Sequence, residues 1–82
     1  MTLRNPQGLH ARPAALLATA VGDLDAEVRI SHGGRDADAG SSLELMALGA
    51  GQGAELELSA SGPDAATALR VVGDLVADGF GE

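Results

Sequence analysis

The strongest constraint on the fold is a stretch of strict alternation in the second half of the chain. Residues 54–61 read Ala-Glu-Leu-Glu-Leu-Ser-Ala-Ser, so apolar and polar side chains alternate without a break. Successive side chains of a strand point to opposite faces, and this pattern therefore predicts a half-buried strand. Residues 27–31 alternate in the same way. Strands with one apolar face need one covering layer, which favours an antiparallel sheet with helices on one side.

Two other stretches have the helical period that such a layer requires. The first follows Pro13 and ends near Gly22, and its apolar face consists of Leu17, Ala20, Val21 and Leu24. The second opens at Asp64, which can cap or stabilise the first turn, and ends at Gly79. Its stripe consists of Ala65, Ala68, Leu69, Val72, Leu75 and Val76.

A shorter helix is expected between Ser41 and Gly49. Ser41 and Glu44 fit a capping box, in which Ser41 caps the helix and Glu44 reaches back to the N-cap residue. The helix has more apolar residues than one narrow face can bury, and exposed apolar residues on a small protein often mark a docking surface. Our candidates for that surface are Leu43, Met46 and Leu48.

Together these stretches predict an α+β fold, an open-faced βαββαβα sandwich. Its four-stranded antiparallel sheet would include a very short first strand at residues 2–4 and a weak strand at residues 35–39, and three helices would cover one face. Eighty-two residues make a single domain, 1–82.

Composition excludes several classes of function. The net charge is −7 with five arginines and no lysine, which argues against a nucleic-acid partner. The absence of cysteine rules out disulfides and thiolate metal sites, and two histidines do not make a metal site. No run of residues is apolar enough for membrane insertion. We expect a cytoplasmic monomer without a metal or another cofactor.

The residues before the first long helix have the chemistry of a phosphate site. We expect His10, Ala11 and Arg12 to form a short non-helical lead-in, because Pro13 suits a first helical turn and disfavours helix at the residue before it. The N–H groups of Ala11, Arg12 and Ala14 would face the phosphate at the positive end of the helix. His10 supplies a nucleophile and Arg12 a guanidinium that matches phosphate oxygens.

Residues 5–14, Asn-Pro-Gln-Gly-Leu-His-Ala-Arg-Pro-Ala, resemble the active-site signature of HPr, the histidine-containing phosphocarrier protein of the phosphoenolpyruvate-dependent phosphotransferase system. Residues 41–49, 53–55 and 79–82 resemble three further segments of that family. The resemblance implies that His10 takes a phosphoryl group on Nδ1 from phospho-enzyme I and passes it to an EIIA-type histidine, without a cofactor. It also implies the open-faced sandwich expected above. Compared with that family the first strand starts several residues late, and we therefore expect the domain to have been excised from a longer multidomain chain.

Several alternatives stay open. The chain also resembles the HPr-like part of the dihydroxyacetone kinase phosphotransferase subunit, so it can be a module of that subunit or a free-standing HPr of sugar uptake. It would count as part of an enzyme in the first case only. A non-catalytic regulatory binder on the same fold leaves His10 unexplained, and a hydrolase using His10 as a base lacks a nucleophile.

Ser41 aligns with a position that a regulatory kinase phosphorylates in some HPr proteins. Two departures weaken this reading, because Gly40 precedes Ser41 where a basic residue is often found and Ser42 follows it where a large apolar residue is usual. Glu44 would also repel a phosphate there. The capping box explains Ser41 without any modification.

Overall fold

The computed structural model describes residues 1–82 as three helices, three strands and a closing turn. In chain order these are α1 (Ala11–Gly22), β1 (Glu27–His32), β2 (Arg35–Asp38), α2 (Ser42–Ala47), β3 (Glu57–Ser61), α3 (Ala65–Ala77) and the 3₁₀ turn η1 (Gly79–Gly81). None of the helices combines the length and the apolar character needed to cross a bilayer.

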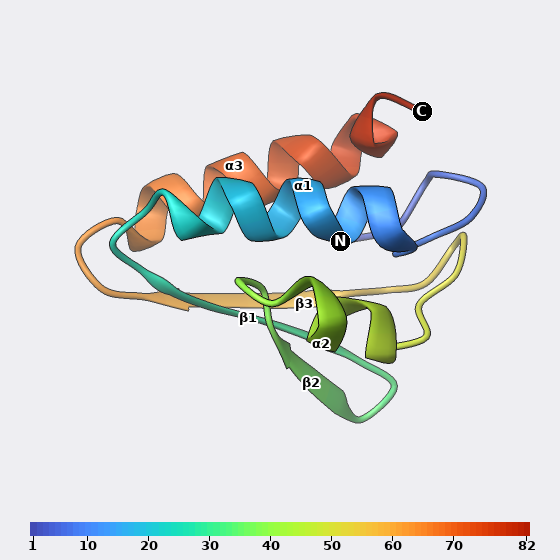
Figure 1. Ribbon diagram of the computed structural model, residues 1–82, viewed down its shortest axis with the longest axis horizontal. Helices are drawn as coiled ribbons and strands as arrows, with labels where there is room; N and C mark the ends of the chain where they lie inside the picture. The colour runs from blue at the N-terminus through green and yellow to red at the C-terminus, as the bar shows by residue number, and fades with distance from the viewer.

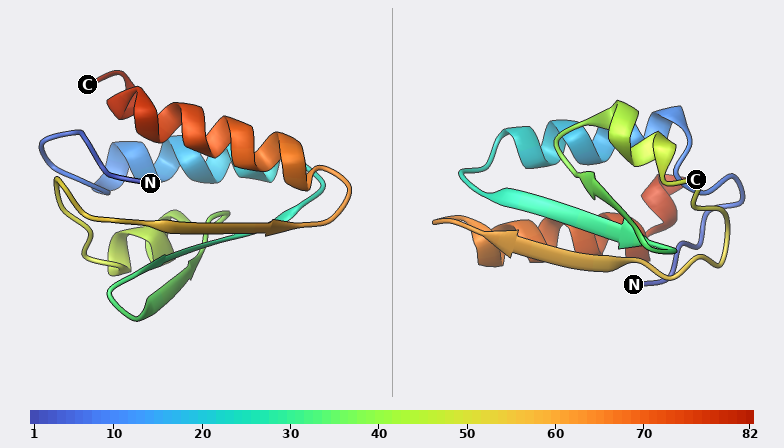
Figure 2. Two further views of the ribbon diagram at one scale, coloured as in Figure 1. Left: turned by 180° about the vertical axis from the view of Figure 1, so that it is seen from behind. Right: turned by 90° about the horizontal axis from the view of Figure 1, so that it is seen from below.

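The strands form one antiparallel sheet in the order β2-β1-β3. In its register Ile30 of β1 lies opposite Ala37 of β2 and Leu58 of β3, so the alternating strands turn their apolar residues to the same face. Helices α1 and α3 lie side by side over that face, and α2 packs against α1 and β2 (Figures 1 and 2). The α+β class and the single apolar face are as predicted.

The fourth strand predicted at residues 2–4 is absent as a strand, and the prediction of four strands is wrong. Thr2 forms a single bridge with Glu55, the Leu3 N–H donates to the Ala54 carbonyl at 2.9 Å, and the Gly53 N–H donates to the Leu3 carbonyl at 2.8 Å. Pro6 cannot donate to a ladder and the chain turns away at residues 5–8. Because the pairing stops there, β3 begins at residue 57 rather than 54.

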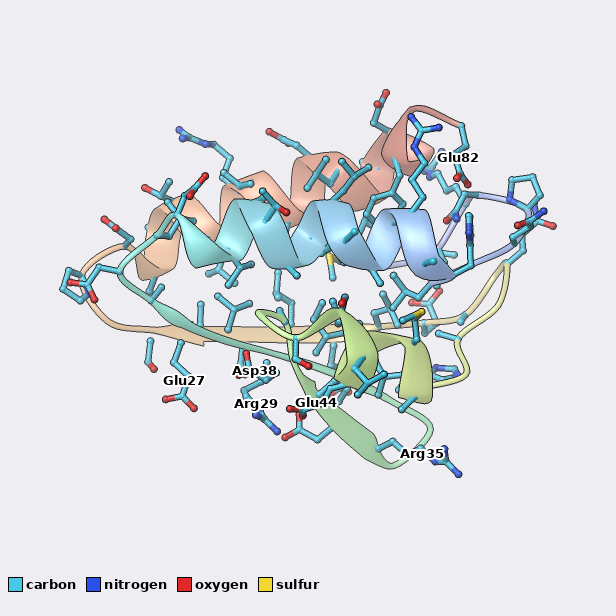
Figure 3. The ribbon with its side chains drawn as sticks, viewed as in Figure 1. Glu27, Arg29, Arg35, Asp38, Glu44 and Glu82 are labelled. Atoms are coloured by element: carbon cyan, nitrogen blue, oxygen red, sulfur yellow. The ribbon has the colours of Figure 1, made fainter.

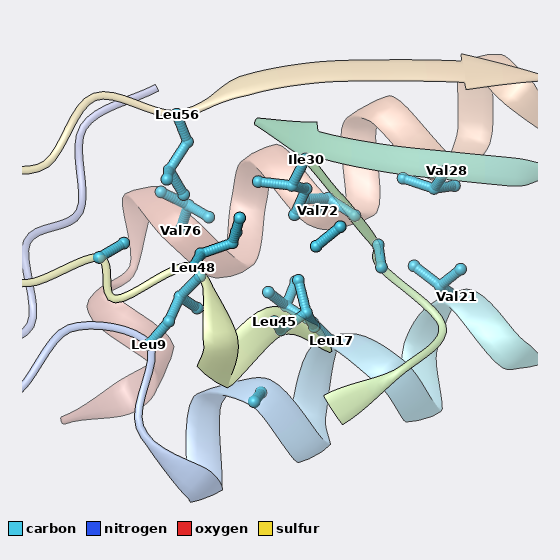
Figure 4. Close-up of a cluster of buried hydrophobic side chains, with 14 of the residues drawn as sticks. Leu9, Leu17, Val21, Val28, Ile30, Leu45, Leu48, Leu56, Val72 and Val76 are labelled. Atoms are coloured by element: carbon cyan, nitrogen blue, oxygen red, sulfur yellow. The ribbon is translucent and has the colours of Figure 1, made fainter. Parts of the chain in front are cut away.

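The hydrophobic core lies between the sheet and the helices. Leu17 of α1, Ile30 of β1, Leu45 of α2 and Val72 of α3 are all fully buried and meet in one cluster (Figure 4). Each of these elements therefore contributes at least one large side chain to the same core. Leu45 is the buried residue of α2, and it fixes this short helix against the rest of the protein.

Replacing Leu45 with alanine should lower the free energy of unfolding by about 2–5 kcal/mol, because it removes a buried side chain and leaves a cavity. Urea denaturation measures this loss. Leu43, on the same helix, is 75% exposed, and Leu43→Ala should change the free energy by about 0.5 kcal/mol or less. Equal losses for the two variants would contradict the burial described here.

The helix termini correct two of the predicted caps. The Ser41 hydroxyl accepts a hydrogen bond from the Glu44 N–H at 3.2 Å, which confirms Ser41 as the N-cap of α2. The Glu44 carboxylate does not reach back to Ser41, however, and instead accepts from the Asp38 N–H at 3.2 Å. Asp64 is the N-cap residue of α3 but makes no side-chain capping hydrogen bond, because its carboxylate accepts from the Asp25 N–H at 2.7 Å. Both carboxylates tie their helices to neighbouring segments of the chain.

Candidate functional site

His10 is the N-cap residue of α1 and has an extended backbone, with φ −83° and ψ −170°. The predicted non-helical lead-in is wrong beyond His10, because Ala11 and Arg12 are already helical. Pro13 is then the third residue of the helix, where its missing N–H still costs no hydrogen bond. The imidazole is therefore attached directly to the positive end of a twelve-residue helix.

The N–H groups at this end divide into free and occupied ones. Those of Ala11 and Arg12 have no acceptor in the backbone, as expected for the first turn. The Ala14 N–H donates to the His10 carbonyl at 3.1 Å, and Ala14 is fully buried. The prediction that Ala14 binds phosphate is therefore wrong, whereas the N–H groups of Ala11 and Arg12 are left without a partner. The Arg12 residue is exposed, as a phosphate ligand requires.

The histidine ring has a partner that the sequence analysis missed. Its Nε2 lies 3.0 Å from Oε2 and 3.3 Å from Oε1 of Glu82, 72 residues away along the chain. Asn5 contacts the same carboxylate, with its Nδ2 donating to Glu82 Oε1 at 3.1 Å. Figure 3 shows Glu82 beside the start of α1. The ring's other nitrogen, Nδ1, makes no hydrogen bond in the protein.

The loop that carries His10 is held by residues on both sides of it. The Leu9 N–H donates to the Ala50 carbonyl at 3.0 Å, and Asn5 Nδ2 donates to the Gly8 carbonyl at 2.6 Å. Gly8 has a positive φ of 65° and lies directly against the segment after α2. A Cβ at this position would lie 2.2 Å from the Ala50 oxygen, so only glycine fits. The loop is thus fixed to the end of α2.

Gly8→Ala should therefore disturb the position of His10. The added Cβ forces the loop away from Ala50, and we expect a loss of about 2 kcal/mol or more in the free energy of unfolding. Gly33, at a φ of 57° but with nothing within 4 Å of a Cβ, is the matched control. Gly33→Ala carries the conformational cost without the clash, so a loss as large as that of Gly8→Ala would contradict the close approach.

Helix α2 lies beside the N-terminal half of α1 (Figures 1 and 2), and two of its apolar side chains are exposed. Leu43 is 75% exposed and Met46 is 38% exposed. Leu48 is only 4% exposed and belongs to the core, so its assignment to the docking surface is wrong. A short helix that packs against both α1 and β2 buries two of its apolar positions, and sequence spacing alone did not identify which two.

Other charged groups of interest lie away from this site. Arg29 of β1 donates two hydrogen bonds to Asp36, and these lower the pKa of the Asp36 carboxyl. Arg29, like Glu27, projects from the sheet on the side opposite α1 and α3 (Figure 3). His32 contacts the Glu55 carbonyl rather than His10. No three His, Asp or Glu side chains are arranged to hold a metal ion.

A family model described as the phosphorylation site of the HPr component of the phosphotransferase system matches residues 1–78. The chain belongs to the HPr family. The family resemblance noted in the sequence is therefore confirmed. The crystal structure of HPr from Thermoanaerobacter tengcongensis superposes on this chain with a TM-score of 0.95, at 34% sequence identity. The match covers 100% of this chain and 92% of the Thermoanaerobacter chain.

HPr relatives occur both as free proteins and within longer ones. The phosphocarrier protein HPr of Cupriavidus necator is 40% identical, covering 99% of this chain and 91% of that protein. The multiphosphoryl transfer protein of Salmonella typhimurium is 36% identical over 98% of this chain, and the phosphoryl donor subunit DhaM of the phosphoenolpyruvate-dependent dihydroxyacetone kinase of Providencia stuartii is 38% identical over 98%. The chain spans only 22% and 17% of those two proteins.

Proposed function

We propose that this HPr domain carries a phosphoryl group on Nδ1 of His10. The observation that carries the proposal is the state of the ring: Nε2 is occupied by Glu82 while Nδ1 is unpartnered. The ring stands at the start of α1, beside the free N–H groups of Ala11 and Arg12. Phosphoryl oxygens bound to Nδ1 would gain those N–H groups and the positive end of the helix.

The transfer needs positioning and charge stabilisation only. The Nδ1 lone pair forms a bond to phosphorus while the bond between phosphorus and the donor's histidine nitrogen breaks and its electron pair returns to the donor's ring. Passing the group onward is the reverse exchange with the acceptor's histidine. His10 is about one-third exposed and lies at no deep pocket, which suits attack by a second protein.

The partners that we propose are enzyme I as donor and an EIIA-type protein or domain as acceptor, both in the cytoplasm. Leu43 and Met46 are exposed on α2 and offer them an apolar contact, and the segment that follows α2 is hydrogen-bonded to the His10 loop. The exposed surface of α1 carries no lysine, and after Arg12 it has no basic residue at all. The partners of this surface should therefore rely less on acidic side chains than on apolar contact.

The direct test is a relay in solution. The protein is incubated with phosphoenolpyruvate and enzyme I, and its intact mass is measured at neutral or mildly alkaline pH. We expect a single acid-labile phosphate, which disappears when an unphosphorylated EIIA-type protein is added. A phosphate that survives acid, or one that no EIIA-type protein removes, would contradict a histidine carrier.

Arg12→Ala should slow phosphorylation about tenfold, because it removes a charge-assisted contact to the phosphoryl oxygens. Arg12→Lys keeps the charge but loses the two-pronged geometry and should recover only part of the rate. Initial rates with limiting enzyme I measure both. Arg70→Ala, at an exposed position on α3, is the control for charge alone. Equal slowing in Arg70→Ala would show that Arg12 acts through overall charge.

We also propose that this domain acts as the HPr-like module of a dihydroxyacetone kinase phosphotransferase subunit, with a free-standing HPr of sugar uptake as the alternative. The supporting observation is that two of the four relatives described above contain the HPr segment within a much longer chain. The rates of phosphoryl transfer to the acceptor proteins of the two systems distinguish these possibilities, because the domain should transfer faster to the acceptor of its own system.

A further inference from the structure

We propose that Asn5 is a positioning residue that acts on His10 through Glu82, an inference that rests on the proposed function of His10. Asn5 fixes the Glu82 carboxylate, and the carboxylate in turn fixes the proton of the His10 ring on Nε2. The lone pair is then held on Nδ1, the nitrogen that faces the phosphoryl group. The site is thus built from both ends of this sequence.

The contacts of Asn5 show that its side chain acts as a hydrogen-bond donor to Glu82. Asn5 is 2% exposed, and its Nδ2 donates both to the Gly8 carbonyl at 2.6 Å and to Glu82 Oε1 at 3.1 Å. Both neighbours are acceptors, which requires the amide to turn its nitrogen toward them. Its Oδ1 is buried without a hydrogen-bond partner. The amide therefore serves the site as a donor only, and one of its two bonds goes to the carboxylate.

The carboxylate acts on the ring by accepting a proton. A Glu82 oxygen 3.0 Å from Nε2 favours the tautomer with hydrogen on Nε2, because an ionised carboxylate can only accept. When Nδ1 binds phosphorus, the ring gains positive charge and keeps its proton on Nε2. A carboxylate held at that nitrogen stabilises this charge. The carboxylate lies on the side of the ring opposite the phosphoryl oxygens.

The backbone after α3 is shaped to deliver this carboxylate. Gly79, Phe80 and Gly81 have φ values of 61°, 57° and 73°, three consecutive left-handed residues. Phe80 is not a glycine, so its conformation is strained, and its side chain, 3% exposed, is anchored in the core. The Glu82 N–H then donates to the Gly79 carbonyl at 3.1 Å. The turn reverses the chain and brings Glu82 back to the start of α1.

A structural role of Asn5 in the loop is the competing explanation, because Asn5 also binds the Gly8 carbonyl. Two measurements separate the explanations. The first is the tautomer of His10, read from the ¹⁵N chemical shifts of both ring nitrogens at a pH where the ring is neutral. We expect the Nε2–H form alone in the wild type and in Glu82→Gln, which keeps an acceptor. Glu82→Ala and Asn5→Ala should show a mixture with the Nδ1–H form.

The second measurement is a double-mutant cycle on the rate of phosphorylation by enzyme I and phosphoenolpyruvate. Asn5→Ala and Glu82→Ala should each slow the reaction about tenfold, and the double variant should be no slower than Glu82→Ala. Glu57→Gln, an exposed carboxylate on β3, is the control and should match the wild type. Thermal unfolding of each variant identifies any that loses its fold.

The outcomes divide cleanly. If Glu82→Ala shows the Nε2–H tautomer alone, or is phosphorylated at the wild-type rate, the role of Glu82 would be overturned. A full tenfold loss from Asn5→Ala in the Glu82→Ala background would show that Asn5 acts on the loop alone and would overturn the proposal for Asn5. The tautomer needs no phosphoryl transfer, so a wild type that accepts no phosphate would count against the proposed function and leave this reading intact.

Discussion

His10→Ala should take up no phosphate from phosphoenolpyruvate and enzyme I, while keeping the fold and stability of the wild type. The imidazole stands at the start of α1 with Nδ1 unpartnered, and it is the nitrogen nucleophile that the proposed transfer requires. Its side chain is about one-third exposed, so its removal leaves little empty space. Intact-mass spectrometry under mildly alkaline conditions measures the phosphate, and thermal unfolding measures the stability.

The second histidine provides the matched control. His32 ends β1, and its Nδ1 contacts the Glu55 carbonyl at 3.2 Å rather than any group of the site. His32→Ala should therefore take up phosphate at the wild-type rate. Phosphate on His10→Ala, or its loss from His32→Ala alone, would move the acceptor away from His10.

Leu43→Glu combined with Met46→Glu should lower the kcat/KM of phosphoryl transfer about 100-fold or more. Both side chains are exposed on α2, next to the His10 loop, and two buried contacts at the centre of an interface commonly contribute about 2 kcal/mol or more each. The added carboxylates would also have to be desolvated on docking. The rates are measured at several concentrations of enzyme I, because a docking defect should appear mainly as a raised KM.

Leu69→Glu tests whether any exposed leucine has this effect. Leu69 is 42% exposed on α3, which begins at the opposite end of the molecule from the start of α1 (Figure 1). We expect Leu69→Glu to leave the transfer rate unchanged. If the α2 double variant kept the wild-type kcat/KM, or if Leu69→Glu slowed transfer equally, α2 would not be the docking surface.

The parts of the fold that sequence could predict are those with local signals. The alternation of residues 27–31 placed β1, and the stripe containing Ala68, Val72 and Val76 placed the buried face of α3. The candidate site was visible for the same reason, since His10 and Arg12 lie within three residues of each other. The N-cap Ser41 was likewise a local pattern.

The errors arose where long-range contacts decide the structure. Residues 2–4 have the composition of a strand, but the turn that follows limits their pairing to a single bridge. The burial of Leu48 depends on how α2 packs against α1 and β2. The contact between Glu82 and His10 spans 72 residues and needs the left-handed turn at residues 79–81. The family-like ending at residues 79–82 was the one signal that could have revealed it.

We propose that His10 carries the phosphoryl group on Nδ1, with Nε2 occupied by Glu82. The most direct test is to phosphorylate ¹⁵N-labelled protein with phosphoenolpyruvate and enzyme I and to observe which ring nitrogen couples to ³¹P. We expect a single phosphorus coupled to Nδ1 of His10. Coupling to Nε2, a phosphate on another residue such as Ser41, or no phosphate at all would contradict it.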